Sequence, residues 1–204
     1  MLDFVFRTHL RLALHAALLF AVGIFVSFPI VRYRLRALAW PAAQAFRLIV
    51  WLIGQSPDIP RMAAVIFLFN TVAMFVYMAS GFHPLLPKVF GIWTGLNIGV
   101  ILSMAREGRL EERTRPTGKQ WRPPPRLSEI CGIAVLAVEL PCFWFSIAMG
   151  MGMGHAVQAG TQPYWAALGT RATAYFAIIA PLLLCSAIAE AIAIRGTSSA
   201  SSSP

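Results

Sequence analysis

Long apolar segments alternate with short polar ones along the 204-residue chain. Five of the apolar segments reach about 20 residues, the length that a helix needs to cross the hydrocarbon core of a bilayer. Helices are expected because lipid cannot satisfy backbone polar groups, and the alternating pattern of membrane barrel strands is absent. We predict an all-α, polytopic transmembrane helical bundle with spans at about 10–31, 62–82, 85–105, 130–155 and 172–194.

A different pattern occupies residues 35–55, between the first two spans. Polar and tryptophan side chains recur there at steps of three or four residues, with apolar residues on most of the other side. This pattern predicts an amphipathic helix that lies in the headgroup layer. A sixth span is the alternative, but it would bury Arg47 and place Arg32 on the wrong side of the membrane.

Small residues at four-residue spacing form two stripes within the predicted spans. Such spacing places them on one face of a helix, where small side chains let two backbones approach closely in lipid. The pattern does not distinguish helices of one chain from helices of two chains. We predict helix-packing roles for Gly91, Gly95, Gly99 and Ser103 in the third span, and for Ser146, Gly150 and Gly154 in the fourth.

Glu139 is the acidic residue that the sequence places near the middle of the fourth span. An ionised carboxylate there costs about 3 kcal/mol on insertion scales, and burial favours its neutral form. Pro141 follows closely, and it cannot donate a backbone hydrogen bond. Asn70 and Asn97 lie in the second and third spans, where asparagine usually bonds across helices. These four residues are the candidate functional polar positions.

Two hypotheses for Glu139 remain open at this point. In one, it is a proton- or ion-responsive group, or a contact for a substrate. In the other, it is a protonated acid that hydrogen bonds to another helix through Asn70 or Asn97.

The composition supports a single transmembrane domain. Hydrophobic residues make up 58% of the chain and charged residues 12%, whereas soluble domains are about a quarter charged. The net charge of +9 comes from basic residues between the apolar segments, where they would meet lipid headgroups. We therefore expect membrane lipid and no nucleic acid as a partner, with the domain over 1–195 and a disordered Ser-rich tail over 196–204.

The distribution of Lys and Arg predicts an orientation. Placing the basic loop 106–126 in the cytoplasm puts thirteen of the seventeen Lys and Arg residues inside. The N-terminus is then external and the C-terminus internal, in a multi-pass protein of the bacterial inner membrane.

No catalytic motif appears in the sequence. It contains no nucleophile elbow, P-loop, dinucleotide-binding turn or zinc-protease pair, and its three cysteines show no metal-ligand spacing. We expect no enzyme activity, no cofactor and no metal site.

Asn70 in an apolar helix, Gly81 at a short turn, the stretch 95–99 around Asn97, and Glu139 followed by Leu140 and Pro141 occur in that order. In this pattern the chain resembles the stage II sporulation protein M family of integral membrane proteins. The resemblance covers about residues 70–154, and residues 134–136 stand where that family has Pro-His-Gly. It implies a multi-span protein without catalytic machinery, similar to a scaffold that holds cell-wall hydrolases at the engulfing septum.

Two functions follow as hypotheses. The first is a membrane scaffold or accessory subunit that binds partner proteins in a membrane complex, with a homo-oligomer as one form of it. The alternative is a transporter or permease component with a polar path around Glu139, Asn70 and Asn97.

Overall fold

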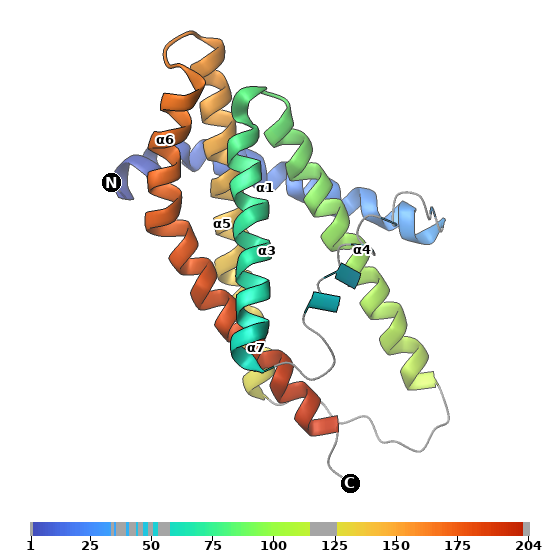
Figure 1. Ribbon diagram of the computed structural model, residues 1–204. Coiled ribbons are helices and arrows are strands. Elements are labelled where there is room, and N and C mark those ends of the chain that lie inside the picture. The colour runs from blue at the N-terminus through green and yellow to red at the C-terminus, as the bar shows by residue number, and fades with distance from the viewer. Residues whose placement is uncertain are drawn as a thin grey trace.

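The computed structural model describes residues 2–33, 58–114 and 126–201, with isolated positions between 35 and 52. Each described element is a helix (Figure 1). In chain order they are α1 (Leu2–Arg32), α3 (Ile59–Ala79), the 3-10 turn η1 (Ser80–Phe82), α4 (Leu86–Thr114), α5 (Arg126–Gln158), α6 (Tyr164–Ala174), the π-helical turn η2 (Tyr175–Ile179) and α7 (Ala180–Ser201).

Five helical segments among the described residues are long and apolar enough to cross a membrane. They are His9–Arg32, Ile59–Phe82, Leu86–Ser103, Val135–Gln158 and Tyr164–Arg195. These helices confirm the prediction of an all-α, polytopic bundle, with five helices that are long and apolar enough to span a membrane.

The last span begins earlier than predicted. Helix α6 starts at Tyr164 rather than at residue 172, because Arg171 does not interrupt the helix. Its guanidinium donates a hydrogen bond to the carbonyl oxygen of Ala167 at 3.1 Å. The segment α6–η2–α7 is continuous, and its one widened turn ends two residues before Pro181, which has no N–H to donate.

Two polar segments are more helical than the sequence predicted. Helix α4 continues to Thr114, so residues 106–114 of the expected loop 106–126 are helical, because arginine, glutamate and leucine favour helices. Helix α7 continues through Ser201, into the segment 196–204 that we expected to be disordered. No proline occurs between residues 182 and 201 to end it.

The predicted interfacial helix 35–55 lies mostly outside the described residues, as do residues 115–125 and 202–204. Trp40 and Trp51, two of the isolated positions that are described, are exposed. The interfacial helix stays a prediction.

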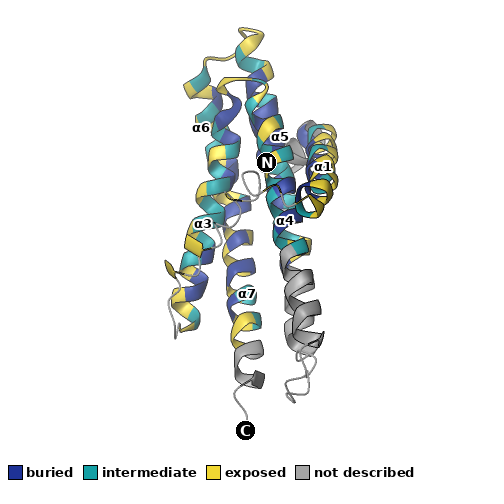
Figure 2. Cartoon of the chain, turned by 90° about the vertical axis from the view of Figure 1, so that its right-hand side faces the viewer, coloured by how far each residue is buried: buried dark blue, intermediate teal, exposed yellow. Residues whose placement is uncertain are grey.

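The helices α3, α5 and α6–α7 lie lengthwise beside one another (Figure 1). The α3–α4 and α5–α6 turns lie at one end of this group, and the start of α3 and the end of α7 lie at the other. Helix α1 runs across the group instead of along it, and the view in Figure 2 looks nearly along the axis of α1. Its contacts are with α4 and α5.

Close backbone approach joins α1 to α4. A Cβ atom on Gly95 would collide with the carbonyl oxygen of Phe20, and one on Gly99 would collide with the hydroxyl of Ser27. On the α1 side, a Cβ on Gly23 would collide with the backbone of α4. Gly91 is less crowded, because a Cβ atom there would lie 3.4 Å from the nearest atom of α1. These contacts lie within one chain.

The second stripe packs on the turn that follows α3. A Cβ on Gly150 would lie 2.6 Å from the carbonyl oxygen of Tyr77, and one on Gly154 would lie 3.1 Å from Cα of Pro84. A Cβ on Gly81 would in turn collide with the carbonyl oxygen of Gly150. The turn of the α3–α4 hairpin, together with the end of α3, therefore packs directly on α5.

The main core lies between α1, α3, α5 and α7. Phe20 of α1 meets Phe143 of α5 edge to face, with 5.5 Å between the ring centroids. Ser146 of α5 is completely buried and donates to the carbonyl oxygen of Cys142 at 2.8 Å. Ser103 is only partly buried. The buried positions in Figure 2 face the neighbouring helices, and exposed apolar positions cover the outside.

Replacing Gly95 with alanine should destabilise the protein, whereas the same change at Gly169 should not. A Cβ at Gly95 meets the α1 backbone, and overpacking of this kind costs about 1–3 kcal/mol. A Cβ at Gly169 meets nothing within 4 Å, and alanine favours the helix there by up to about 1 kcal/mol. Unfolding of both variants in mild detergent, followed by circular dichroism, measures the difference. Equal stabilities would show that α1 and α4 do not approach closely.

Candidate functional site

Polar side chains from three helices meet at Glu139. Asn70 of α3 donates from Nδ2 to Oε1 of Glu139 at 2.9 Å. Ser186 of α7 donates from Oγ to the same oxygen at 3.1 Å. Glu139 itself lies on α5, so one carboxyl oxygen connects three helices that are far apart in the sequence.

The surroundings explain why these residues bond to each other. Ser186 is 3% exposed, and apolar side chains such as Phe143 and Leu183 form the adjacent core. Asn70 and Glu139 are half-buried, and lipid offers no hydrogen bonds to replace the protein partners. Each hydrogen bond between helices in lipid contributes roughly 0.6–2 kcal/mol.

A second hydrogen bond connects α3 to the last span nearby. The Tyr175 hydroxyl donates to the carbonyl oxygen of Thr71 at 2.8 Å, and Thr71 directly follows Asn70. Tyr175 is completely buried and opens the π-helical turn η2. The α3 backbone is thus held by the last span, and the neighbouring Asn70 side chain is held by α5.

Pro141 does not interrupt α5, which is continuous from Arg126 to Gln158. The proline is partly buried two residues after Glu139. Its effect on the structure is therefore local to the turn that carries Glu139.

Asn97 does not join the cluster. Its Oδ1 atom is buried and has no hydrogen-bond partner among the described residues. The structure thus brings together Asn70 and Glu139 of the predicted polar residues, and it leaves Asn97 apart. Leaving such an acceptor unsatisfied typically costs about 1–3 kcal/mol.

Sequence reasoning missed Ser186. A serine in a transmembrane helix usually bonds to the backbone of its own helix, so its residue type carries little information. The spacing of Ser186 from the charged residues Glu190 and Arg195 on the same helix does not indicate a partner on α5 either. Only the packing of α7 against α5 identifies it.

The hydrogen-bonded cluster offers one carboxyl group, one amide and one hydroxyl, and a second carboxyl group, that of Glu190 on α7, interacts electrostatically with Glu139. In the described part of the chain, no group of three or more His, Cys, Asp or Glu side chains is placed to hold a metal ion. The arrangement can connect helices, and the second carboxyl oxygen of Glu139 makes no hydrogen bond to a described residue.

In comparisons with known proteins, no family model, no curated protein and no solved structure matches the chain.

Glu139→Gln should leave the stability nearly unchanged, and Glu139→Leu should lower it. Glutamine keeps an acceptor oxygen for Asn70 and Ser186, whereas leucine leaves both donors unpaired. The expected loss for leucine is about 1–3 kcal/mol, from unsatisfied polar groups. Thermal unfolding of the three proteins in mild detergent compares them. A glutamine variant as unstable as the leucine variant would contradict this role of Oε1.

Proposed function

We propose that the chain is a non-enzymatic integral membrane protein that acts as a scaffold or accessory subunit for partner proteins at the bacterial cell membrane. The observation that supports this most is the bonding of Glu139, whose Oε1 joins α3, α5 and α7. In this function, the carboxyl group of Glu139 serves to hold the helices together.

The glycine contacts support the same proposal. Gly95 and Gly99 pack on α1, and Gly150 and Gly154 pack on the α3–α4 hairpin. These small residues therefore build the chain's own fold, and they are not left as an open path. The surface that remains for partners is the exposed apolar outside of the bundle and its basic end.

The basic end is the second part of the proposal. The segment 106–126 carries seven cations and three anions, and it includes the last residues of α4 and the first residue of α5. Such a segment in the cytoplasm would attract an acidic partner surface or anionic lipid headgroups. We assign the binding of partner proteins to this end.

The resemblance to the stage II sporulation protein M family agrees with this proposal. Two residues on which it rests, Asn70 and Glu139, are hydrogen bonded to each other. A structural pair of this kind fits a multi-span protein without catalytic machinery, which is what the resemblance implies.

A transporter or permease component is the second candidate. Two observations favour it: Asn97 has a buried Oδ1 without a partner among the described residues, and Oε2 of Glu139 makes no hydrogen bond to any of them. In that function, Glu139→Gln would abolish flux while leaving the fold intact.

Replacing Arg109, Arg113 and Arg115 with glutamine should reduce the recovery of partner proteins from membranes solubilised in mild detergent. Removing three positive charges weakens electrostatic attraction at the basic end, while helix-forming residues are kept. Quantitative mass spectrometry of proteins retained by the tagged chain measures the loss. Lys88→Gln, at the opposite end of α4, is the control and should retain them.

Vesicles reconstituted with the purified chain separate the two candidates. The scaffold proposal predicts the same ion and solute leakage for the wild type and for Glu139→Gln. Uptake that depends on Glu139, together with no partner lost on changing the arginines, would replace the scaffold by a transporter.

A further inference from the structure

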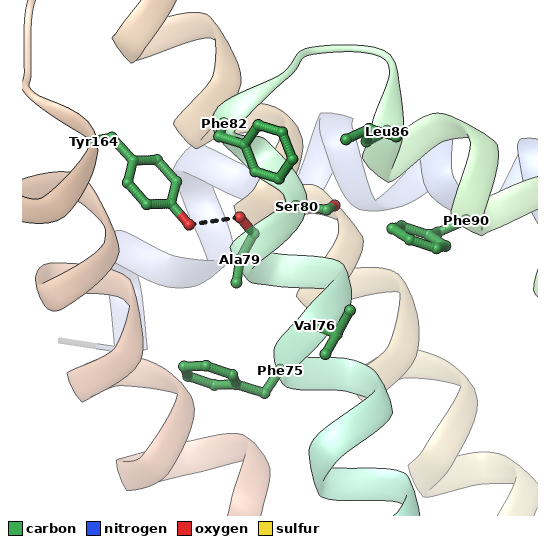
Figure 3. A pocket seen from close by; sticks show the side chains of 8 residues that line it. All are labelled: Phe75, Val76, Ala79, Ser80, Phe82, Leu86, Phe90 and Tyr164. Atoms are coloured by element: carbon green, nitrogen blue, oxygen red, sulfur yellow. Dashed lines mark hydrogen bonds between the residues drawn. The ribbon is translucent and has the colours of Figure 1, made fainter.

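A shallow apolar groove crosses the outer face of α3 close to its C-terminal end. Figure 3 shows α3 between α6 on one side and the start of α4 on the other. Phe75, Val76 and Ala79 lie on α3. The larger side chains of Phe82, Leu86 and Phe90 also line the groove. The volume of the groove is about 310 Å³.

The two side-chain hydroxyl groups that line the groove donate their protons to backbone carbonyl groups. The Tyr164 hydroxyl donates to the carbonyl oxygen of Ala79 at 2.8 Å, as Figure 3 shows. The Ser80 hydroxyl donates to the carbonyl oxygen of Tyr77 at 2.7 Å. A bound water molecule needs two to four polar partners, and these hydroxyls offer none of their protons to it.

The groove lies on an exposed apolar surface of helices that are long and apolar enough to span a membrane. Its residues come from the ends of two membrane-spanning segments, Ile59–Phe82 and Leu86–Ser103, and from the start of a third. Val76 and Phe82 are exposed, and the neighbouring Trp165 is 77% exposed. Aromatic side chains at a span end are typical of the boundary between hydrocarbon and headgroups.

From these observations we infer that the groove binds one acyl chain of a membrane phospholipid, and that it holds the chain through its tail and not through its headgroup. The mostly apolar lining disfavours water, and an empty apolar depression forfeits dispersion contacts. A volume near the lower limit of small-molecule pockets, about 300 Å³, fits a flexible hydrocarbon segment better than a bulky ligand. This site goes beyond the proposed function and does not depend on it.

Photo-crosslinking in a defined membrane tests the site. The full chain is reconstituted in phosphatidylcholine vesicles that contain a phosphatidylcholine with a diazirine on its acyl chain. After irradiation, peptide mapping should show adducts at Val76, Phe82 and Leu86 several-fold above those at Leu68 and Leu102, which are exposed apolar residues outside the groove.

Filling the groove should abolish most of this excess. Ala79→Phe places a ring on α3 within the groove, and Val76→Phe serves the same purpose if the first variant does not fold. Leu68→Phe is the matched control, because Leu68 lies on α3 outside the groove and is 62% exposed. Its labelling pattern should equal that of the wild type.

Three outcomes would overturn the inference. Equal labelling over all exposed apolar residues would show only general contact with the bilayer. Unchanged labelling in a folded, filled variant would place the acyl chain elsewhere. Labelling of the groove residues below that of Leu68 and Leu102 would show that the groove is covered by protein and not by lipid.

Exchanging the phosphatidylcholine probe for a phosphatidylglycerol probe should leave the excess unchanged. A loss of the excess would assign recognition to the headgroup and contradict binding through the tail.

Discussion

Hydrocarbon offers no hydrogen bonds, so a carboxyl group within the bundle must find its donors on neighbouring helices. In this protein, Oε1 of Glu139 accepts hydrogen bonds from Asn70 of α3 and from Ser186 of α7. This single oxygen connects α3, α5 and α7 through side-chain hydrogen bonds. The Tyr175 bond to the α3 backbone reinforces the same three-helix unit.

Helix α1 is held by a different force. It crosses the unit and meets α4 through Gly23, Gly95 and Gly99, where backbone approach replaces side-chain bonding. In lipid, no hydrophobic force drives two helices together. Dispersion between closely packed backbones therefore becomes a main source of their attraction. The fold therefore combines one polar connection among three helices with one tightly packed crossing between two. Both are internal, which is why the scaffold proposal places partners on the outside.

The sequence was sufficient for the five spans because each is long, apolar and bounded by charge or proline. It was also sufficient to name Asn70 as one candidate partner of Glu139, because few polar groups occur in the spans. It could not select Asn70 over Asn97, since both α3 and α4 contact α5 and the choice depends on which of them lies beside Glu139. The start of the last span was missed because Arg171 bonds to its own helix, and the direction of α1 leaves no periodic signal.

The central claim is that the Asn70–Glu139 contact is an energetic link between helices. A double-mutant cycle with Asn70→Leu, Glu139→Leu and the double variant, unfolded reversibly in the same detergent, measures the coupling directly. The account predicts a favourable coupling of about 0.6 kcal/mol or more, as for other hydrogen bonds between membrane helices. Strictly additive effects of the two substitutions would contradict it.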